Sequence, residues 1–270
     1  SGDVRCPVSV VIRCYRCADT TDRALDSIRQ QSSLPAEIIL ADDASDDGGA
    51  TQQAIENARG RFNADCNIIY VALPKNGGPA VARNVAWEKA TQPYIAFLDA
   101  DDAWHPKKLE IQMQWMLANP HAQISGHASR AISPNATATE QTVEWQVREI
   151  EPMQMLWSNP FATRGVIVRR DLPLRFPENM RYAEDYFLWL SIAFSGRKAF
   201  VSPAILAFSF KADYGESGLT KKLWPIEKCE LRVFRQLWHA GKIGWPTMLA
   251  AQIWSLARFV RRVVLLRLRA

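Results

Sequence analysis

Three aspartates, Asp99, Asp101 and Asp102, follow the apolar stretch 94–98 almost without interruption. At a buried strand end, carboxylates this close together repel one another unless a cation lies among them. Mg²⁺ and Mn²⁺ are hard cations that are often held by one or two carboxylates and complete their shells with water and substrate phosphates. The run therefore predicts a divalent metal site; a solvated acidic turn in which Asp102 caps the next helix is the alternative.

Two further acidic residues, Asp42 and Asp43, follow the apolar stretch 37–41. A carboxylate at a strand end can accept hydrogen bonds from a base N–H or a ribose hydroxyl, as acidic residues do in other nucleoside sites. We therefore expect Asp43 to contact a nucleoside. The turn residues that follow favour helix-cap and turn positions for Asp46 and Asp47.

A pair of glycines, Gly77 and Gly78, precedes Pro79, and Arg83 follows one helical turn later. Pro79 suits the first turn of a helix because its missing N–H is not needed there. Backbone N–H groups at a helix N-terminus, together with a guanidinium, can bind a nucleotide or its phosphates. Taken alone, the glycines indicate only a turn, but their place between two acidic strand ends points to a site.

Short apolar runs rich in β-branched or aromatic residues alternate with helix-like segments in the first part of the chain. The expected strands are 8–12, 37–41, 67–72 and 94–98, and the expected helices are 20–31, 49–59 and 79–91. Nearly continuous hydrophobicity in the strands indicates a parallel sheet that is covered by helices on both faces. Ligands bind such sheets beyond the carboxyl ends of the strands, where the candidate residues should converge.

The rest of the chain is less regular in its pattern. Residues 105–119 and 183–194 have helical spacing, and residues 164–169 and 199–210 are strand-like. The chain has 270 residues, of which 48% are hydrophobic, enough for one globular unit or a core domain with an appendage. Its five cysteines form no repeated pattern, which favours free thiols in a reducing compartment. No stretch of about 18 uncharged apolar residues is present to suggest a membrane-spanning helix.

Positive charge gathers near the C-terminus, because no acidic residue follows Glu230. A helix over 245–270 would carry Arg258, Arg261, Arg262 and Arg269 toward one side, with Ile253, Leu256, Val260, Val264 and Leu268 largely opposite. A basic amphipathic helix of this kind can lie in an anionic membrane interface. A helix that docks on the protein's own core is an equally good interpretation.

Four motifs together resemble a family 2 glycosyltransferase of the GT-A fold. An opening V-S-V-V-I-x-x-Y strand, here Val8 to Tyr15, leads to D-D-x-S-x-D-G, here Asp42 to Gly48. A G-G-P-x-x-A-R-N stretch, here Gly77 to Asn84, then precedes L-D-x-D-D-x-W, here Leu98 to Trp104. Four motifs in the family's order are far more specific than any one of them. The later segment Glu184 to Leu190 is similar to the family's E-D-x-x-L-W-L.

The resemblance implies an α/β protein of the GT-A fold, with a Rossmann-like, mostly parallel sheet flanked by helices and a helical C-terminal extension. It implies a catalytic domain over 1–222, with a nucleotide-sugar half at about 1–105 and an acceptor half at 106–222. Residues 223–270 are then the basic amphipathic helical extension.

The same resemblance assigns roles to individual residues. It implies that Asp185 is the general base and that Glu184 orients it or touches the acceptor; first-turn stabilisation of a helix is the alternative for both. A carboxylate that takes the acceptor's proton is worth roughly 10²–10⁴ in rate. Asp43 is expected to bind the base and Asp99 the ribose. The full set expected at the donor is Arg13, Tyr15, Asp43, Arg83, Asp99, Asp101 and Lys211, with Asp101 and Asp102 at the metal.

The activity implied is an inverting single displacement that moves one sugar from a nucleotide-sugar, with a UDP-sugar favoured, to a hydroxyl acceptor. The acceptor is expected to be a glycan or a lipid-linked glycan of cell-surface polysaccharide or glycolipid synthesis. The resemblance also implies a divalent metal, Mn²⁺ or Mg²⁺, and no nucleic-acid partner. We expect a cytoplasmic location, with peripheral contact at the inner face of the membrane through the C-terminal helix.

Some positions depart from the family pattern. Arg13 stands where many relatives have proline or threonine, and Lys211 lies where they often have a Y-R-x-H segment. The Q-x-x-R-W signature of processive polymerases is absent, which favours transfer of a single sugar. Two alternatives come from other classes of protein. Cys14-x-x-Cys17 imitates a thioredoxin-like redox pair, and an acidic pair after a strand also occurs in Mg²⁺-binding receiver modules, which are much shorter.

Overall fold

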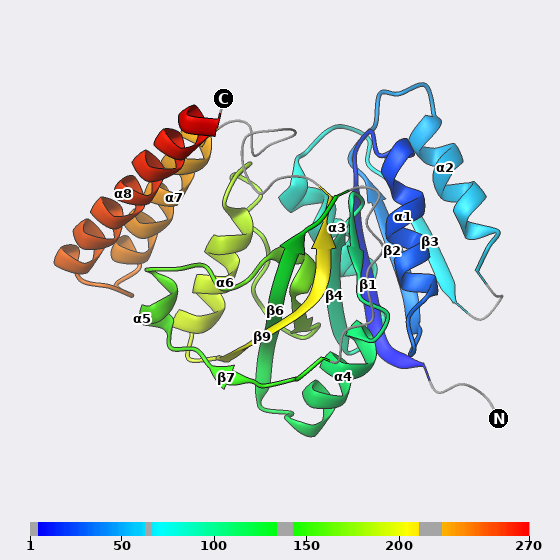
Figure 1. The fold of residues 1–270 in the computed structure, drawn as a ribbon, viewed down its shortest axis with the longest axis horizontal. Helices are drawn as coiled ribbons and strands as arrows, with labels where there is room; N and C mark the ends of the chain where they lie inside the picture. The colour runs from blue at the N-terminus through cyan, green and yellow to red at the C-terminus, as the bar shows by residue number, and fades with distance from the viewer. Residues whose placement is uncertain (1–4, 63–65, 134–142, 211–222, 270) are drawn as a thin grey trace.

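The computed structural model describes residues 5–62, 66–133, 143–210 and 223–269. Figure 1 shows a central sheet with helices on both faces and a pair of long helices, α7 and α8, at one side. The strand order is β3-β2-β1-β4-β8-β6-β9-β5, and β7 pairs with β9. The first four strands of this order are mutually parallel, whereas β8, β5 and β7 each pair in antiparallel fashion.

The strands expected from the sequence are confirmed with small extensions. The observed strands are β1 (Cys6–Cys14), β2 (Pro35–Asp42), β3 (Asn67–Ala72), β4 (Tyr94–Asp99), β5 (Asp102–Trp104), β6 (Ala122–Ala131), β7 (Arg148–Glu149), β8 (Ile167–Arg169) and β9 (Lys198–Ser209). The expected strand 164–169 is wrong at its start, where residues Thr163–Gly165 form a 3₁₀ turn, η1.

The expected helices are likewise found with shifts of a few residues. The observed helices are α1 (Ala18–Arg29), α2 (Ala50–Arg59), α3 (Pro79–Lys89), α4 (Lys108–Ala118), α5 (Pro152–Met155), α6 (Glu184–Phe194), α7 (Leu223–His239) and α8 (Trp245–Arg269), of which the short α5 was not expected. None of the described helices is both long enough and apolar enough to cross a bilayer.

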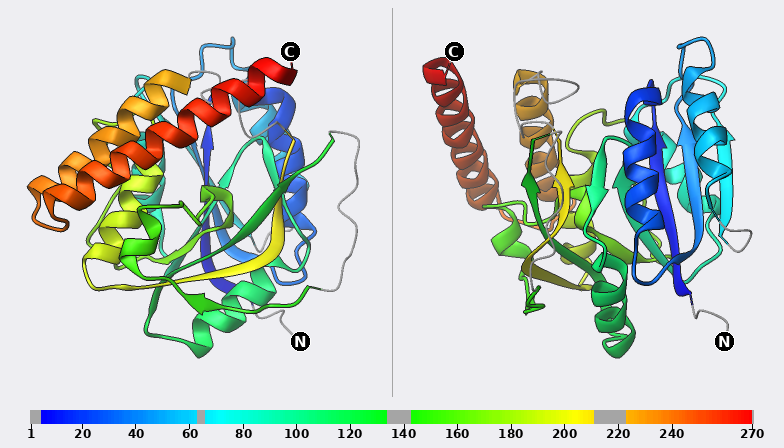
Figure 2. Two further views of the ribbon diagram at one scale, coloured as in Figure 1. Left: turned by 60° about the vertical axis from the view of Figure 1, so that its left-hand side comes forward. Right: turned by 45° about the vertical axis from the view of Figure 1, so that its right-hand side comes forward.

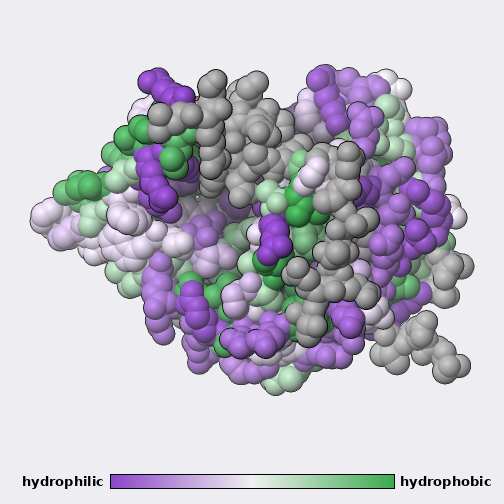
Figure 3. Space-filling model, viewed as in Figure 1, coloured by the Kyte–Doolittle hydropathy of each residue, from purple (hydrophilic) through white to green (hydrophobic). Residues whose placement is uncertain are grey.

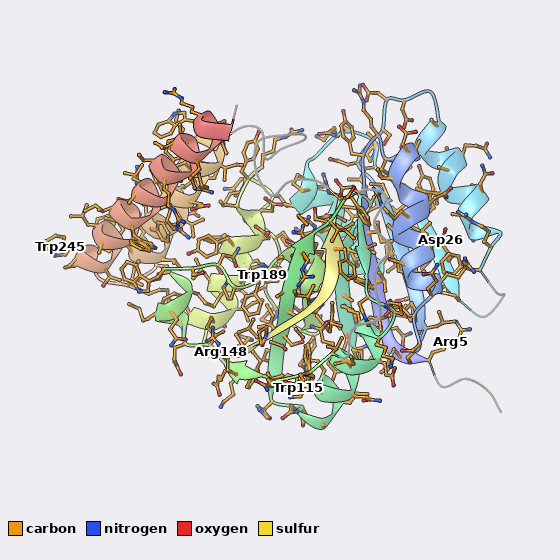
Figure 4. All side chains as sticks on the ribbon, in the orientation of Figure 1. Arg5, Asp26, Trp115, Arg148, Trp189 and Trp245 are labelled. Atoms are coloured by element: carbon orange, nitrogen blue, oxygen red, sulfur yellow. The ribbon has the colours of Figure 1, made fainter. Side chains whose placement is uncertain are left out.

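Two buried clusters lie on opposite faces of the sheet. Along β1 the alternation places Val10 and Ile12 in the cluster that α1, α2 and α4 cover, and Val11 in the cluster that α3 and α6 cover. An aromatic group fills the second cluster, where the rings of Phe97 and Phe176 lie 5.3 Å apart and Phe176 and Trp189 lie 5.7 Å apart. Figure 4 shows Trp189 on α6, directed toward the sheet. These ring contacts pack α6 against β4.

Helix α7 joins the second cluster, and α8 reaches it only near its start, through Ala251 and Met248. Val233, Phe234 and Leu237 of α7 are buried in that cluster, and the Phe234 ring lies 6.2 Å from the ring of Tyr186 on α6. In both views of Figure 2, α8 runs along the outer side of α7, so that α7 separates most of α8 from the sheet. The helical extension expected from the sequence is therefore a two-helix hairpin.

Candidate active site

The candidate residues come from the carboxyl ends of β1, β2 and β4 and from the N-terminus of α6. Arg13 on β1 lies beside Asp99 on β4 in the parallel register, with Arg13 Nε 3.9 Å from Asp99 Oδ1. Among the residues that the structure describes, three non-glycine residues have positive φ, and each is next to a candidate: Arg16 (47°), Ala44 (53°) and Ala183 (54°). Such conformations are uncommon for residues with a Cβ and tend to cluster at functional sites.

The Arg83 guanidinium joins the two halves of the site. Its Nη2 donates to Asp99 Oδ1 at 2.8 Å and its Nη1 donates to Glu184 Oε1 at 2.9 Å. The side chain is only 7% exposed, and its guanidinium carbon lies 5.4 Å from the centre of the Phe176 ring. Arg83 was expected at the nucleotide; in this structure both of its terminal nitrogens are engaged by carboxylates. It therefore fixes Asp99 and Glu184 relative to each other.

The pKa values of the two carboxylates that contact Arg83, Asp99 and Glu184, are shifted in opposite directions. Burial acts to raise the pKa of Asp99, but the charges of Arg83 and Arg13 outweigh it and lower the pKa to about 2. Burial raises the pKa of Glu184 to about 7, the charge of Asp185 adds to this rise, and Arg83 opposes it. Asp99 faces two arginines, whereas Glu184 shares one arginine and lies next to another carboxylate.

Asp185 lies in the first turn of α6 and is held by neighbours. The Thr163 hydroxyl of η1 donates to Asp185 Oδ2 at 2.7 Å, and the backbone N–H of Tyr186 donates to Oδ1 at 2.7 Å. The side chain stays partly exposed, whereas Glu184 is buried. Asp185 is thus both oriented and accessible, as a general base must be.

Asp101 and Asp102 differ in their surroundings. Asp102 is buried, and Arg164 Nη1 donates to its Oδ2 at 3.2 Å. Burial raises the pKa of Asp102 to about 7, with further contributions from the charges of Asp99 and Asp101 that Arg164 only partly offsets. Asp101 is partly exposed in the turn between β4 and β5. Negative charge is therefore in excess at this turn.

The carboxylates of Asp101 and Asp102 fit a hard divalent cation of the kind that the sequence predicts. Among the described residues, no group of three or more His, Cys, Asp or Glu side chains is arranged to hold a metal by itself. Mg²⁺ does not require such a group, because one or two carboxylates suffice when phosphates and water supply the other ligands. The partly exposed Asp101, with Asp102 beside it, meets this requirement.

Asp43 holds the glycine turn that begins α3. Its two carboxylate oxygens accept the backbone N–H groups of Gly77 at 2.7 Å and Gly78 at 2.9 Å. Gly78 has a φ of +89°, and a Cβ on Gly77 would lie 2.8 Å from Cβ of Val81. The turn therefore requires both glycines. The N–H groups expected at a phosphate are taken up by Asp43, and its contact with a nucleoside base stays a prediction.

Of the two remaining residues expected at the donor, Tyr15 can be located and Lys211 cannot. Tyr15 is exposed beyond β1, and its hydroxyl donates to Asp46 at 3.3 Å. Asp46 also accepts hydrogen bonds from the Arg16 guanidinium. Asp47 accepts the backbone N–H of Thr51 at 3.1 Å in the first turn of α2, as the turn chemistry indicated. Lys211 lies outside the described residues.

Sequence reasoning missed the residues that hold the acids in place. Thr163, Arg164 and Phe176 come from segments without a recognisable motif, and each contacts Asp185, Asp102 or Arg83 as described above. Arg164 lay at the start of an expected strand, but nothing in its spacing related it to Asp102. Only the contact between the two chain segments reveals these partners.

The five cysteines are free, as expected. Cys14 and Cys17 are buried at the end of β1 and the start of α1. The hydrogen bond between them is the main cause that lowers the pKa of Cys17 to about 7.

A mostly parallel sheet with acidic residues at its carboxyl edge and an acidic helix start facing them defines a nucleotide-sugar-dependent transferase of the GT-A type. The model of the family described as "Glycosyl transferase family 2" matches residues 9–172, more than half of the chain. The chain belongs to glycosyltransferase family 2 and is a glycosyltransferase. The redox-protein and receiver-module interpretations are therefore wrong.

Similar proteins support this assignment. The chain is 28% identical over 243 residues to the putative teichuronic acid biosynthesis glycosyltransferase TuaG of Bacillus subtilis, covering 88% of this chain and 92% of that one. It is 31% identical over 189 residues to WfgD of Escherichia coli, a UDP-Glc:alpha-D-GlcNAc-diphosphoundecaprenol beta-1,3-glucosyltransferase, covering 68% and 69%. Mannosyltransferase PcManGT of Pyrobaculum calidifontis, solved with GDP-Man and Mn²⁺, superposes with a TM-score of 0.67 at 20% identity, covering 94% and 74%. The expected GT-A fold is confirmed.

Proposed function

We propose that this glycosyltransferase transfers one sugar from a UDP-sugar, with inversion and with a bound divalent metal, to a hydroxyl of a glycan or lipid-linked acceptor. The relatives named for teichuronic acid and for a diphosphoundecaprenol-linked acceptor support a role in bacterial surface polysaccharide synthesis. We place the reaction at the inner face of the cytoplasmic membrane, in a catalytic domain over 1–222 with residues 223–270 as its extension.

One observation carries the proposal: Arg83 bridges Asp99 at the donor end and Glu184 at the acceptor end, with Asp185 next to Glu184. Asp99 is then placed to accept a ribose hydroxyl, and Arg13 lies beside it. Asp101 and Asp102 would hold the divalent metal, which neutralises charge on the departing diphosphate when it is bound.

Asp185 is the better general base of the two acids on α6. A base must reach the acceptor hydroxyl, and Asp185 is partly exposed whereas Glu184 is buried against Arg83. The hydrogen bond from Thr163 fixes one carboxylate oxygen of Asp185 without covering the side chain. Glu184 then acts by holding Arg83 and by setting the electrostatic field around Asp185.

The test is a panel of nucleotide sugars, scored by release of the nucleoside diphosphate with Mn²⁺ or Mg²⁺ and with lipid-linked and soluble glycan acceptors. Asp185→Asn should lower kcat by roughly 10²–10⁴ and leave UDP binding by calorimetry unchanged. Glu184→Gln keeps a side chain of the same shape and should retain more activity. A product with the donor's own anomeric configuration, or an active Asp185→Asn enzyme, would refute the mechanism.

A further inference from the structure

In the α7–α8 hairpin, α8 directs two of its arginines toward α7 and leaves most of its large apolar side chains exposed. Ala251 and Ser255 of α8 are fully buried where α8 packs on α7. On the same side, Arg262 donates to Glu227 at 3.1 Å and Arg258 lies 3.5 Å from Glu230. The sequence set the arginines apart from the apolar residues; the structure shows that two of those arginines face α7.

The outward side of α8 is a continuous apolar stripe. It consists of Trp245, Leu249, Ile253, Leu256, Val260 and Val264, which are 37–63% exposed. Their spacing of three or four residues places them in one row along the helix. From Trp245 to Val264 this row measures about 29 Å at 1.5 Å per residue. Soluble monomers rarely expose an apolar row this long, and such rows mark interaction surfaces.

Exposed tryptophans occur on both helices of the hairpin. Trp254 lies beside the stripe on α8, and its indole N–H donates to the carbonyl of Trp157 at 2.9 Å. Trp224 and Trp238 are exposed on α7. Figure 4 shows Trp245 at the outer end of α8, pointing away from the rest of the protein. Tryptophan is the residue type that gathers where hydrocarbon meets water at a membrane surface.

The exposed charged side chains in the described part of the hairpin are all positive. In the described part of α7, α8 and their connection, the exposed charged side chains are Lys228, Arg232, Arg235, Lys242, Arg261 and Arg267. The only acidic residues of 223–270 are Glu227 and Glu230, and both face arginines of α8. Figure 3 shows hydrophobic and strongly hydrophilic residues side by side over these helices. A partner for this surface therefore combines apolar material with negative charge.

We propose that the stripe of α8 lies in the headgroup region of an anionic lipid bilayer. The stripe enters the interface and the surrounding lysines and arginines contact lipid phosphates, in the manner of an interfacial helix. The helix does not span the bilayer, because it is not apolar enough. A second copy of the chain fits less well, since pairing the two stripes would bring the basic residues of both copies together.

This inference deepens the peripheral contact proposed above and identifies the side of the helix that makes it. It can fail independently of the proposed function, because no candidate site residue lies on α8. Donor hydrolysis and vesicle binding are measured separately for that reason.

The experiment is vesicle flotation of the full chain with phosphatidylcholine alone and with phosphatidylcholine plus phosphatidylglycerol. The double variant Ile253→Asp and Val260→Asp places charge in the exposed stripe. The control Gln52→Asp and Asn57→Asp adds the same charge at exposed positions of α2. The wild type and the control should bind anionic vesicles at least about tenfold more tightly than the stripe variant. Binding should weaken as salt screens the charges.

Three results would overturn the proposal. They are equal binding by the stripe variant and the control, equal binding to neutral and anionic vesicles, and a wild type that floats with neither. A wild-type dimer in ultracentrifugation that the stripe variant abolishes, without vesicle binding, would assign the stripe to a second copy instead. Because the substituted residues are exposed, all variants should unfold at the wild-type temperature and keep their slow donor hydrolysis.

Discussion

Replacing Glu184 by glutamine should change how the stability of this enzyme depends on pH. Burial against Asp185 raises the folded-state pKa of Glu184 from 4.5 to about 7. A carboxyl group with a raised folded-state pKa favours folding while it is protonated in both states. That contribution is fully present below pH 4.5 and is lost as the pH rises to about 7. The unfolding free energy of the wild type should therefore fall between pH 4.5 and about 7 as Glu184 ionises. Glutamine does not ionise, so Glu184→Gln should not show this fall.

The magnitude follows from the shift in pKa. Each pKa unit corresponds to about 1.4 kcal/mol, so the shift amounts to about 3 kcal/mol of unfolding free energy. Glutamine also loses the ion pair with Arg83, which is 2.9 Å long in the wild type. The favourable interaction with Arg83 already contributes to the folded-state pKa of about 7 and is not counted a second time, and Arg83 retains Asp99 as a partner. The quantity to compare is therefore how the difference in unfolding free energy between the wild type and Glu184→Gln changes with pH.

Urea unfolding of both proteins at intervals from pH 4.5 to 8 measures this quantity. Relative to the wild type, Glu184→Gln should gain about 3 kcal/mol in unfolding free energy between the two ends of the series. Glu149→Gln is the control, because Glu149 forms only a surface pair with Lys198, and such pairs contribute little. Parallel curves for wild type and Glu184→Gln across the series would refute the reasoning.

Three further substitutions test the geometry of the site. Asp43→Asn leaves one carbonyl oxygen for two N–H donors, so the unfolding free energy should fall by about 1–3 kcal/mol in urea; unchanged stability with weaker UDP binding would instead favour base recognition. Gly77→Ala places a Cβ 2.8 Å from Cβ of Val81 and should cost about 1–3 kcal/mol, measured by thermal unfolding; adding Val81→Ala should restore only part of this loss, because alanine keeps that Cβ. Thr163→Val removes the hydroxyl that orients Asp185, so kcat should fall severalfold with the donor KM unchanged; a rise in donor KM alone would contradict this.

The donor half of the fold could be predicted because its elements carry local signals. The four parallel strands are short, apolar and rich in β-branched residues, and all but β3 lead directly into polar residues that mark the site. By contrast β6, with the sequence AQISGHASRA, consists mostly of small and polar residues. It is a strand because β8 and β9 pair with it and because the Phe161 ring packs on Gly126. Those partners are distant in sequence, so the local sequence pattern does not predict this strand.

The candidate site divides in the same way. Motifs located the acids, but they did not show that Arg83 lies between Asp99 and Glu184, because those two residues are 85 positions apart. A resemblance transfers residue types and not their partners. The sharing of one guanidinium by two carboxylates is a property of the folded chain alone.

The periodicity of α8 does not determine which of its sides is buried, and the ion pairs with α7 do. The spacing of residues predicts that a helix has an arginine side and an apolar side, but it does not say which side is buried. Here α7 offers Glu227 and Glu230, three residues apart, and α8 offers Arg258 and Arg262, four residues apart, so both pairs form in one helix–helix contact. A buried glutamate without a partner would cost more than exposed apolar surface. Once the arginines turn inward to meet these acids, the apolar residues of α8 must face outward.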